Sequence, residues 1–265
     1  MLEKKNAIVY GGAGAVGGAI ARSLARSGAQ VHLAGRTLEP LERVAAEIRS
    51  TGGAADAARV DAMDERAVGD HVDDVIRRVG GTLDISVNAI GVPHVQGPPL
   101  DELSLAEFEL PLHSYLRSNF VTAKKAAEVM APAGAGVVIT LSTPGSQLPG
   151  AGYLGYGVTC GAVETFSRLL AGELGPAGVR VVCLRANAIP ESLPDSHVTD
   201  VFTQVAGRHG LSAAGWLEAM ASNHTLLGRL PSLDQVGDVA AFVASDRSAA
   251  MTAAIVNLTC GTLAD

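Results

Sequence analysis

The segment AIVYGGAGAVGGAIARSLA, residues 7–25, passes from an apolar run through a glycine-rich turn into a helical pattern. Its first four residues are typical of a buried β-strand, and the periodicity after Gly18 is typical of a helix. Backbone without side chains lets a pyrophosphate approach, and the free N–H groups and dipole of the helix start attract its charge. We therefore predict a nucleotide-binding turn, with a plain tight turn as the alternative. The candidate cofactor-binding residues are Gly11, Gly14, Ala15, Val16 and Gly17.

Strand-type and helix-type segments then alternate along the chain. Further strands are predicted at 30–34, 54–60, 83–88, from 136, at 179–184 and at 253–258. Helices are predicted at 38–50, 65–79, 100–130 with a break near Pro111, 157–174 and 234–244. This alternation predicts an α/β fold with a mainly parallel, doubly wound, seven-stranded sheet and helices on both faces. We expect residues 1–265 to form a single domain.

The composition favours small-molecule partners. The chain has 20 Lys and Arg against 27 Asp and Glu, a formal net charge of −7, and no basic block that would attract nucleic acid or an anionic membrane. Its three cysteines have neither CxxC nor metal-ligand spacing, which predicts free thiols and no metal site. We find no signal peptide or membrane span, and we expect a cytoplasmic protein.

Several strand ends carry candidate cofactor contacts, because ligands of such sheets bind at the carboxyl ends of the strands. Gly35 and Arg36 follow the second strand, where an acidic residue would hold the ribose hydroxyls of NAD. The arginine fork instead suits the 2′-phosphate of NADP, and a merely solvated Arg36 is the alternative. Five residues after the third and fourth strands are further candidate contacts, and their alternative role is simply to form turns. These residues are Asp61, Ala62, Asn88, Ala89 and Gly91.

The stretch GVVITLSTPGSQLPGAGYLGYGVTC, residues 136–160, has the organisation of an active site. An apolar strand ends in Ser142 and Thr143, a Gly/Pro-rich loop follows, and Tyr156 opens a helix. A hydroxyl can donate a hydrogen bond to a substrate carbonyl, and a phenol can supply a proton. One helical turn places Cys160 beside Tyr156.

These elements and residues resemble the short-chain dehydrogenase/reductase family over essentially the whole chain. The family's TGxxxGxG turn is matched by residues 10–17, with Tyr10 and Ala15 as departures, and its NNAG motif by Asn-Ala-Ile-Gly at residues 88–91. The resemblance implies a single-domain Rossmann-type fold, an NAD(P)-dependent oxidoreductase and a homodimer or homotetramer. It also implies a backbone contact to the cofactor at Ile189.

The resemblance assigns the catalytic residues as well. Asn119 matches the asparagine that holds a helix bend and a water of the proton relay. The serine that the family places 13 residues before its tyrosine falls on Thr143, with Ser142 just before it, and the tyrosine itself is Tyr156. The lysine of the family's YxxxK motif is replaced by Cys160, which is the main departure from the pattern.

Loss of the lysine has a direct chemical consequence. Without a neighbouring cation we expect Tyr156 to titrate near the ordinary tyrosine pKa of about 10. A neutral tyrosine can protonate a carbonyl during reduction but is a poor base for oxidising an alcohol. We therefore expect a carbonyl reductase of a small or medium organic substrate, with NADPH preferred and NAD possible as cofactor.

Two other functions stay open. One is a non-redox cyclase, dehydratase or isomerase on the same scaffold, and the other is a catalytically silent NADP-binding protein. A nucleophilic Cys160 is disfavoured because no activating histidine lies near it in sequence. Residues 190–228 are predicted to be a substrate-binding lid within the domain. We interpret His197, His209 and His224 as solvated residues of this region. His94 and His113 lie closer to the expected cleft, but a lone histidine is more often structural than catalytic.

Overall fold

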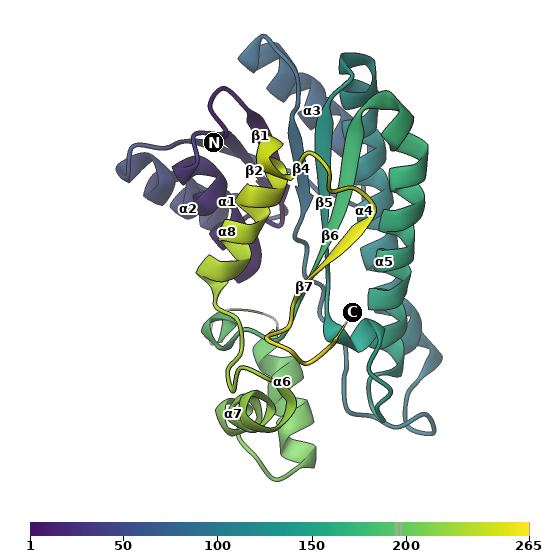
Figure 1. Cartoon of the computed structure of the whole chain (residues 1–265). Coiled ribbons are helices and arrows are strands. Elements are labelled where there is room, and N and C mark those ends of the chain that lie inside the picture. The colour runs from purple at the N-terminus through teal and green to yellow at the C-terminus, as the bar shows by residue number, and fades with distance from the viewer. Residues whose placement is uncertain (194–195, 197, 265) are drawn as a thin grey trace.

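The computed structural model describes residues 1–193, 196 and 198–264. Its sheet has seven parallel strands in the order β3-β2-β1-β4-β5-β6-β7, which confirms the predicted fold class (Figure 1). The strands are β1 (Asn6–Tyr10), β2 (Gln30–Gly35), β3 (Ala54–Arg59), β4 (Ile85–Asn88), β5 (Gly136–Ser142), β6 (Val179–Ala186) and β7 (Ala254–Leu258). The helices are α1 (Ala15–Arg26), α2 (Leu38–Ser50), α3 (Glu65–Val79), α4 (Leu105–Ala133), α5 (Leu154–Leu174), α6 (Val198–Arg208), α7 (Ala213–His224) and α8 (Leu233–Ala244).

Two hydrophobic cores sandwich the sheet because successive strand residues point to opposite faces. Val9 of β1 packs with α1, α2 and α8, whereas Ile8 packs on the other face with α3, α4 and α5. Both residues are fully buried, and burial of each such side chain stabilises the fold by about 1.5–3 kcal/mol. Helices therefore cover both faces of the central strands, as the near-continuous apolar sequences of these strands predict.

The order in which the strands are placed in the sheet reverses between β1 and β4. From β1 it builds outward to β2 and β3, and from β4 it builds the other way to β7. Such a switch point opens a crevice outside the carboxyl ends of the strands. Ala89 N donates to Tyr10 O at 2.9 Å just past these two strands, so the glycine turn and the loop after β4 begin side by side.

The predicted break near Pro111 is wrong. Helix α4 runs without interruption from a capping box in which Ser104 Oγ accepts from Glu107 N and the Glu107 carboxylate accepts from Ser104 N. The box satisfies two donors at the helix start. Pro111 is buried within the helix, whose tertiary packing overrides the local cost of a missing N–H.

Helices α6 and α7 stand at the carboxyl edge of the sheet, below the ends of the strands in Figure 1. Val201 and Phe202 of α6 form a small core with Leu217 of α7 and Leu230, so the two helices have apolar contacts of their own. Residues 190–228 thus include a compact helical pair, whose role as a lid stays a prediction. His197 lies outside the described residues. Across the described part of the chain, no helix is long and apolar enough to cross a membrane.

Candidate active site

The glycine turn is shaped by contacts that exclude side chains. Gly11 adopts φ +77°, and a Cβ there would lie 2.5 Å from Ala89 O. A Cβ on Gly17 would collide with the carbonyl oxygen of Gly11. Gly14 caps α1 without a side-chain hydrogen bond, and the first turn carries no acidic residue. The N–H groups at the start of α1, at Ala15 and Val16, are therefore suited to a dinucleotide pyrophosphate.

Arg36 is exposed immediately after β2, on the same edge of the sheet. No ion pair joins it to another described residue. Asp61, at the end of the neighbouring strand, is also exposed, and its Oδ1 accepts from Met63 N at 3.0 Å. Ala62 beside it is buried. The side chain of Arg36 is thus available to an anionic ligand, while Asp61 is partly used in a local turn.

Asn88 links the loop after β4 to α4. Its Nδ2 donates to Thr122 Oγ1 at 3.1 Å, and its Oδ1 accepts from Ile90 N at 3.2 Å. Asn88 and Ala89 are buried, whereas Gly91 is exposed. Both the nitrogen and the oxygen of this buried amide bond to neighbouring residues and hold the loop in place. A contact of Asn88 with the cofactor would therefore involve its backbone and not its side chain.

Asn119 bonds back along its own helix. Its Nδ2 donates to Tyr115 O at 2.9 Å, while its Oδ1 is buried and has no partner among the described residues. A buried amide oxygen without a partner is costly, which is a reason to assign it an acceptor role. The side chain of Tyr115 points to the site, where its hydroxyl accepts from Val92 N at 3.2 Å.

Tyr156 lies in a cluster of aromatic rings. The His94 ring stacks on it with centroids 3.9 Å apart and planes 11° from parallel, and the Tyr115 ring meets it edge-on at 6.0 Å. Tyr115 and the thiol of Cys160 are titratable neighbours that contribute to the raised pKa of its hydroxyl. The predicted proton donor is therefore surrounded by neutral or aromatic groups in the described part of the site.

The expected pKa of Tyr156, near the ordinary value, is wrong. Burial, followed by the proximity of Tyr115 and Cys160, raises the pKa of Tyr156 well above 10. Burial likewise raises the pKa of Tyr115 to about 12. Removal of the hydroxyl from water disfavours the phenolate, an effect that the sequence alone did not include.

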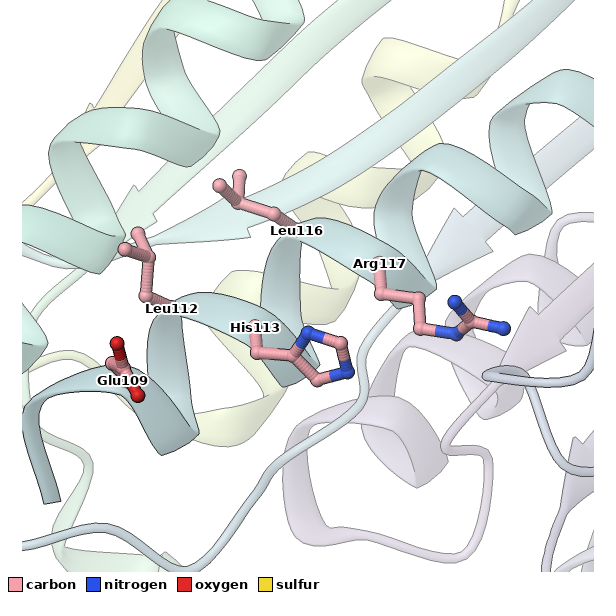
Figure 2. A pocket seen from close by; sticks show the side chains of 5 residues that line it. All are labelled: Glu109, Leu112, His113, Leu116 and Arg117. Carbon is pink, nitrogen blue, oxygen red and sulfur yellow. The ribbon is translucent and has the colours of Figure 1, made fainter. Parts of the chain in front are cut away.

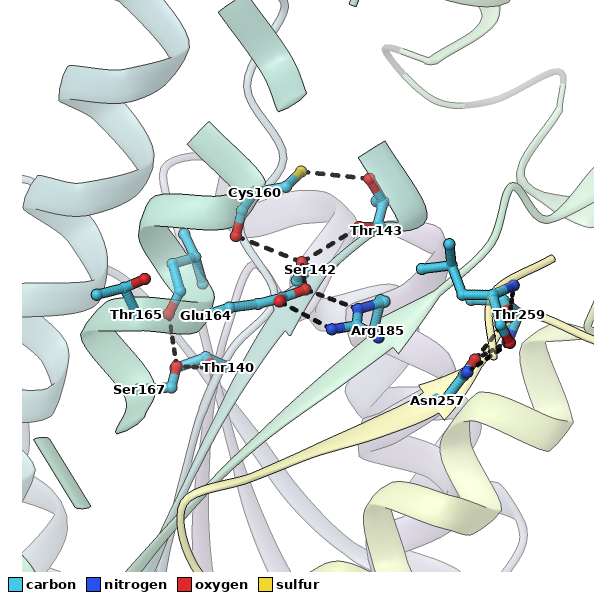
Figure 3. Close-up of polar contacts among 12 residues, drawn as sticks. Thr140, Ser142, Thr143, Cys160, Glu164, Thr165, Ser167, Arg185, Asn257 and Thr259 are labelled. Atoms are coloured by element: carbon cyan, nitrogen blue, oxygen red, sulfur yellow. Dashed lines mark hydrogen bonds and ion pairs between the residues drawn. The ribbon is translucent and has the colours of Figure 1, made fainter. Parts of the chain in front are cut away.

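Cys160 follows Tyr156 by one turn of α5. It is 3 % exposed, and its Sγ lies 3.2 Å from Thr143 Oγ1. Figure 3 draws this contact. Burial raises the pKa of this thiol, so the reactive thiolate is disfavoured. The thiol thus contacts Thr143 at the carboxyl end of β5 and is close enough to Tyr156 to influence the pKa of the phenol.

The shortest hydrogen bond of Ser142 goes to Glu164. Its Oγ donates to Glu164 Oε1 at 2.7 Å, and the carbonyl oxygens of Thr143 and Cys160 lie farther away at 3.4 and 3.5 Å. Glu164 also accepts from Arg185 Nε at 2.8 Å and from Arg185 Nη2 at 2.9 Å (Figure 3). Arg185 and the hydrogen bonds around Glu164 hold the pKa of its carboxyl below the ordinary value, although burial opposes this shift.

The Glu164–Arg185 ion pair connects three elements beneath the site. Glu164 comes from α5 one turn after Cys160, Arg185 from the end of β6 and Ser142 from the end of β5. Glu164 and Arg185 are 3 % and 1 % exposed. Buried charges cost several kcal/mol unless they are paired and hydrogen-bonded, so this pair must be kept complete.

The remaining predicted residues lie at the margins of this cluster. Ile189 is buried just after β6, and its carbonyl accepts from Ser192 N and Ser192 Oγ. His113 is exposed on the outer face of α4, in an open pocket whose lining includes none of the residues around Tyr156 (Figure 2). The other pocket residues are Glu109, Leu112, Leu116 and Arg117.

Sequence reasoning missed four residues of the site. His94 and Tyr115 touch Tyr156 but come from a loop and a helix without a recognised motif. Glu164 and Arg185 could have been suspected from one feature of the sequence. Arg185 lies in the apolar run VVCLRA, and a charged residue in a buried strand requires a buried partner.

Comparisons with known proteins agree with this architecture. A family model described as enoyl-(acyl carrier protein) reductase matches residues 11–262. Xanthoxin dehydrogenase of Arabidopsis thaliana is 30% identical, covering 92% of this chain and 84% of that protein. (+)-Borneol dehydrogenase 2 of Salvia officinalis is 30% identical, with coverage of 91% and 83%.

A solved structure agrees as well. A dehydrogenase/reductase from Sinorhizobium meliloti superposes with a TM-score of 0.81 at 26% identity and covers 99% of this chain and 96% of its own. Family model, relatives and fold all span nearly the full length. The chain therefore belongs to the short-chain dehydrogenase/reductase family and is an NAD(P)-dependent oxidoreductase of that type.

Proposed function

We propose that this protein is an NADPH-preferring carbonyl reductase that acts on a small or medium organic substrate. The observation that carries the proposal is that Cys160 lies between the two hydroxyl residues, since its Sγ is 3.2 Å from Thr143 Oγ1 and its thiol influences the pKa of Tyr156. Two hydroxyl groups held in the same small region can both donate to a carbonyl oxygen that becomes more negative as it is reduced. Two relatives are named as dehydrogenases of xanthoxin and (+)-borneol, which supports an organic small molecule as substrate.

Each residue has a definite task in this proposal. Thr143 donates a hydrogen bond to the carbonyl oxygen, and Tyr156 donates the proton that the oxygen takes up. The unpartnered Oδ1 of Asn119 accepts within the relay that restores this proton. NADPH, when bound, supplies the hydride. The raised pKa of Tyr156 keeps it protonated at neutral pH, which favours reduction over oxidation.

The preference for NADPH rests on Arg36. Its exposed guanidinium has no ion-pair partner among the described residues and stands at the strand end where the ribose is read. A 2′-phosphate accepts two parallel hydrogen bonds from such a fork. The exposed start of α1 and its glycine turn would hold the pyrophosphate of either cofactor, so NADH binding remains compatible with the site.

The test combines cofactor binding with turnover. NADPH and NADH are titrated against the protein by fluorescence, and NADPH oxidation is then followed with a panel of ketones and aldehydes. Tyr156→Phe should lower kcat by about 10²–10⁴-fold, the usual contribution of a positioned acid, and leave NADPH affinity nearly unchanged. Tyr153→Phe, three residues earlier, is the matched control and should keep full activity. Equal activity in both variants would refute the role of Tyr156.

The raised pKa of Tyr156 also favours a second candidate, a non-redox or silent member of the family. A phenol without a fixed cation beside it is a weak acid and a weak base. NADPH binding without oxidation across the panel, together with conversion of a substrate at constant oxidation level, would select a cyclase, dehydratase or isomerase. Binding alone would select a silent NADP-binding protein.

We further propose a homodimer or homotetramer that uses the outer faces of α4 and α5. Large apolar side chains are exposed on both helices, including Leu110 and Phe120 on α4 and Leu169 on α5. Such side chains on two adjacent helices suit a self-complementary interface. Light scattering during size exclusion measures the assembly directly, and a monomer at micromolar concentration would contradict this proposal.

A further inference from the structure

His94 is the residue closest to Tyr156 that the proposed mechanism does not use. It lies in the loop between β4 and α4 and is 8 % exposed. Its ring is nearly parallel to the phenol at 3.9 Å between centroids, and the ring of Tyr115 also lies edge-on to it at 6.5 Å. Nothing can enter between two rings stacked at this distance, so the charge of the imidazole acts directly on the phenol.

The hydrogen bonds of His94 suit both of its charge states. His94 Nδ1 lies 2.8 Å from Val92 O, and because a carbonyl only accepts, Nδ1 carries a proton. His94 Nε2 lies 2.9 Å from the side-chain amide nitrogen of Gln96. A neutral ring accepts from this amide, and an imidazolium donates to the amide oxygen after a half-turn of the Gln96 amide. The buried Gln96 can therefore satisfy Nε2 whether or not it holds a proton.

We propose that His94, as an imidazolium stacked on Tyr156, is the cation of this active site and takes over the electrostatic task of the lysine that Cys160 replaces. This rests on the proposed reductase function. A cation over an aromatic face is attracted to the ring, and a nearby positive charge favours the phenolate. Protonated His94 thus makes Tyr156 a stronger acid toward the substrate carbonyl.

His94 acts through Tyr156 and not on the substrate. In a parallel stack the ring N–H bonds lie in the plane of the imidazole, directed at Val92 and Gln96, so no proton passes directly from His94 to the phenol. His94 is accordingly a positioning residue whose own proton comes from solvent. The arrangement differs from a lysine in one respect, since an imidazole can lose its charge within the neutral pH range.

The other titratable groups that the structure describes near this loop do not supply the charge. Tyr115 and Tyr156 contact the ring, and burial holds the pKa of both above the ordinary value, so both are neutral at neutral pH. Cys160, on the far side of Tyr156, is a buried thiol with a raised pKa. Farther along the loop Arg208 of α6 pairs with Glu102 at 2.6 Å, and their charges compensate each other.

The test uses His94→Phe, which keeps an aromatic stack and removes the charge. In the unmodified protein, kcat for ketone reduction should fall about tenfold as pH rises through the midpoint of the His94 titration, the effect of about one unit in the pKa of the acid. The midpoint is measured by NMR of the imidazole, assigned with His94→Gln. His94→Phe should show the low rate throughout and no inflection. His113→Phe, on the outer face of α4, should keep the original profile.

A second readout needs no turnover. With fluorotyrosine at position 156, the fluorine resonance should shift at the same midpoint as the His94 imidazole, and this step should vanish in His94→Phe. A fluorine resonance that ignores the His94 titration, or a His94→Phe variant that retains the inflection, would overturn the proposal. If no carbonyl is reduced at all, the proposed function fails. The fluorine titration still decides whether the charge of His94 acts on the tyrosine at position 156.

Discussion

The half of the sheet that we propose to bind the nucleotide, from β1 to α3, and the half that we propose to be catalytic, from β5 to β6, are built in different ways. We call them the nucleotide-binding half and the catalytic half. The first half relies on backbone shape, with Gly11 and Gly17 packed too closely for side chains and an exposed Arg36 at the rim. The second half relies on buried side chains that bond to one another, from Thr143 and Cys160 to Glu164 and Arg185.

This difference has a physical lesson. A site made of backbone tolerates changes in the neighbouring side chains, so its degraded motif still specifies the turn. A site made of buried polar side chains is an interdependent network, in which a change of one member leaves another unsatisfied. If Cys160 stands where the family has a lysine, as we propose, its aromatic and charged neighbours must suit the thiol as well.

Breaking the Glu164–Arg185 pair should have the largest effect. Arg185→Met leaves the carboxylate of Glu164 buried without this cation, and the free energy of unfolding should fall by about 3–5 kcal/mol. The double variant Glu164→Leu/Arg185→Met removes both charges and should recover most of that loss. Denaturant unfolding of the three proteins measures both numbers. A double variant no more stable than Arg185→Met would show that the pairing is not the source of the loss.

The nucleotide-binding half contains a buried polar side chain, His71, that lacks a hydrogen-bond partner among the described residues, in contrast to the paired Glu164 and Arg185. His71 of α3 is 6 % exposed, and neither ring nitrogen has a hydrogen-bond partner among the described residues. Burial lowers the pKa of His71 from 6.5 to about 4. The folded protein therefore holds His71 neutral, whereas the unfolded chain takes up a proton below about pH 6.5.

This difference predicts acid sensitivity. The contribution of neutral His71 is fully present above pH about 6.5 and is lost as pH falls toward about 4, by about 3 kcal/mol in all. His71→Leu should reduce the loss of Tm on acidification, measured by calorimetry across this range. His209→Leu, at an exposed position after α6, is the matched control and should keep the original pH dependence. Identical curves for both variants would contradict the assignment.

The sequence predicted the sheet, its strands and the glycine turn because these follow from local patterns. Hydrophobic periodicity marks each element, and the turn at Gly11 needs only backbone freedom. It also predicted that the strand ends near Ser142 and that a helix follows to Leu174, but α5 begins at Leu154, before the predicted start at Gly157. It did not predict the direction of the Ser142 side chain, the stack of His94 on Tyr156 or the raised pKa of Tyr156, because each depends on contacts between segments far apart in the chain.

Restoring the lysine should have a smaller effect that depends on pH. Cys160→Lys places an ammonium one helical turn from Tyr156, which should lower the pKa of the phenol and raise kcat for reduction about tenfold, or about 1.4 kcal/mol. The gain should appear above the pH at which His94 loses its charge and be small below it. Cys160→Met, similar in length but neutral, is the control. A loss of activity in Cys160→Lys at every pH would show that the catalytic half is adapted to the thiol.

Changing Arg36 should have the smallest effect and should be confined to the nucleotide-binding half. Arg36→Ala removes an exposed cation, so the Kd for NADPH should rise about fivefold, or about 1 kcal/mol, because water screens a charge at the surface. The Kd for NADH should not change, since NADH lacks the 2′-phosphate. Arg43→Ala, which removes an exposed arginine of α2 paired with Glu39, is the control for a general change in charge. In the proposed binding mode the turn at Gly11 holds either cofactor through its backbone. An equal loss of NADPH and NADH affinity in Arg36→Ala would therefore mean that this residue shapes the turn and does not select the phosphate.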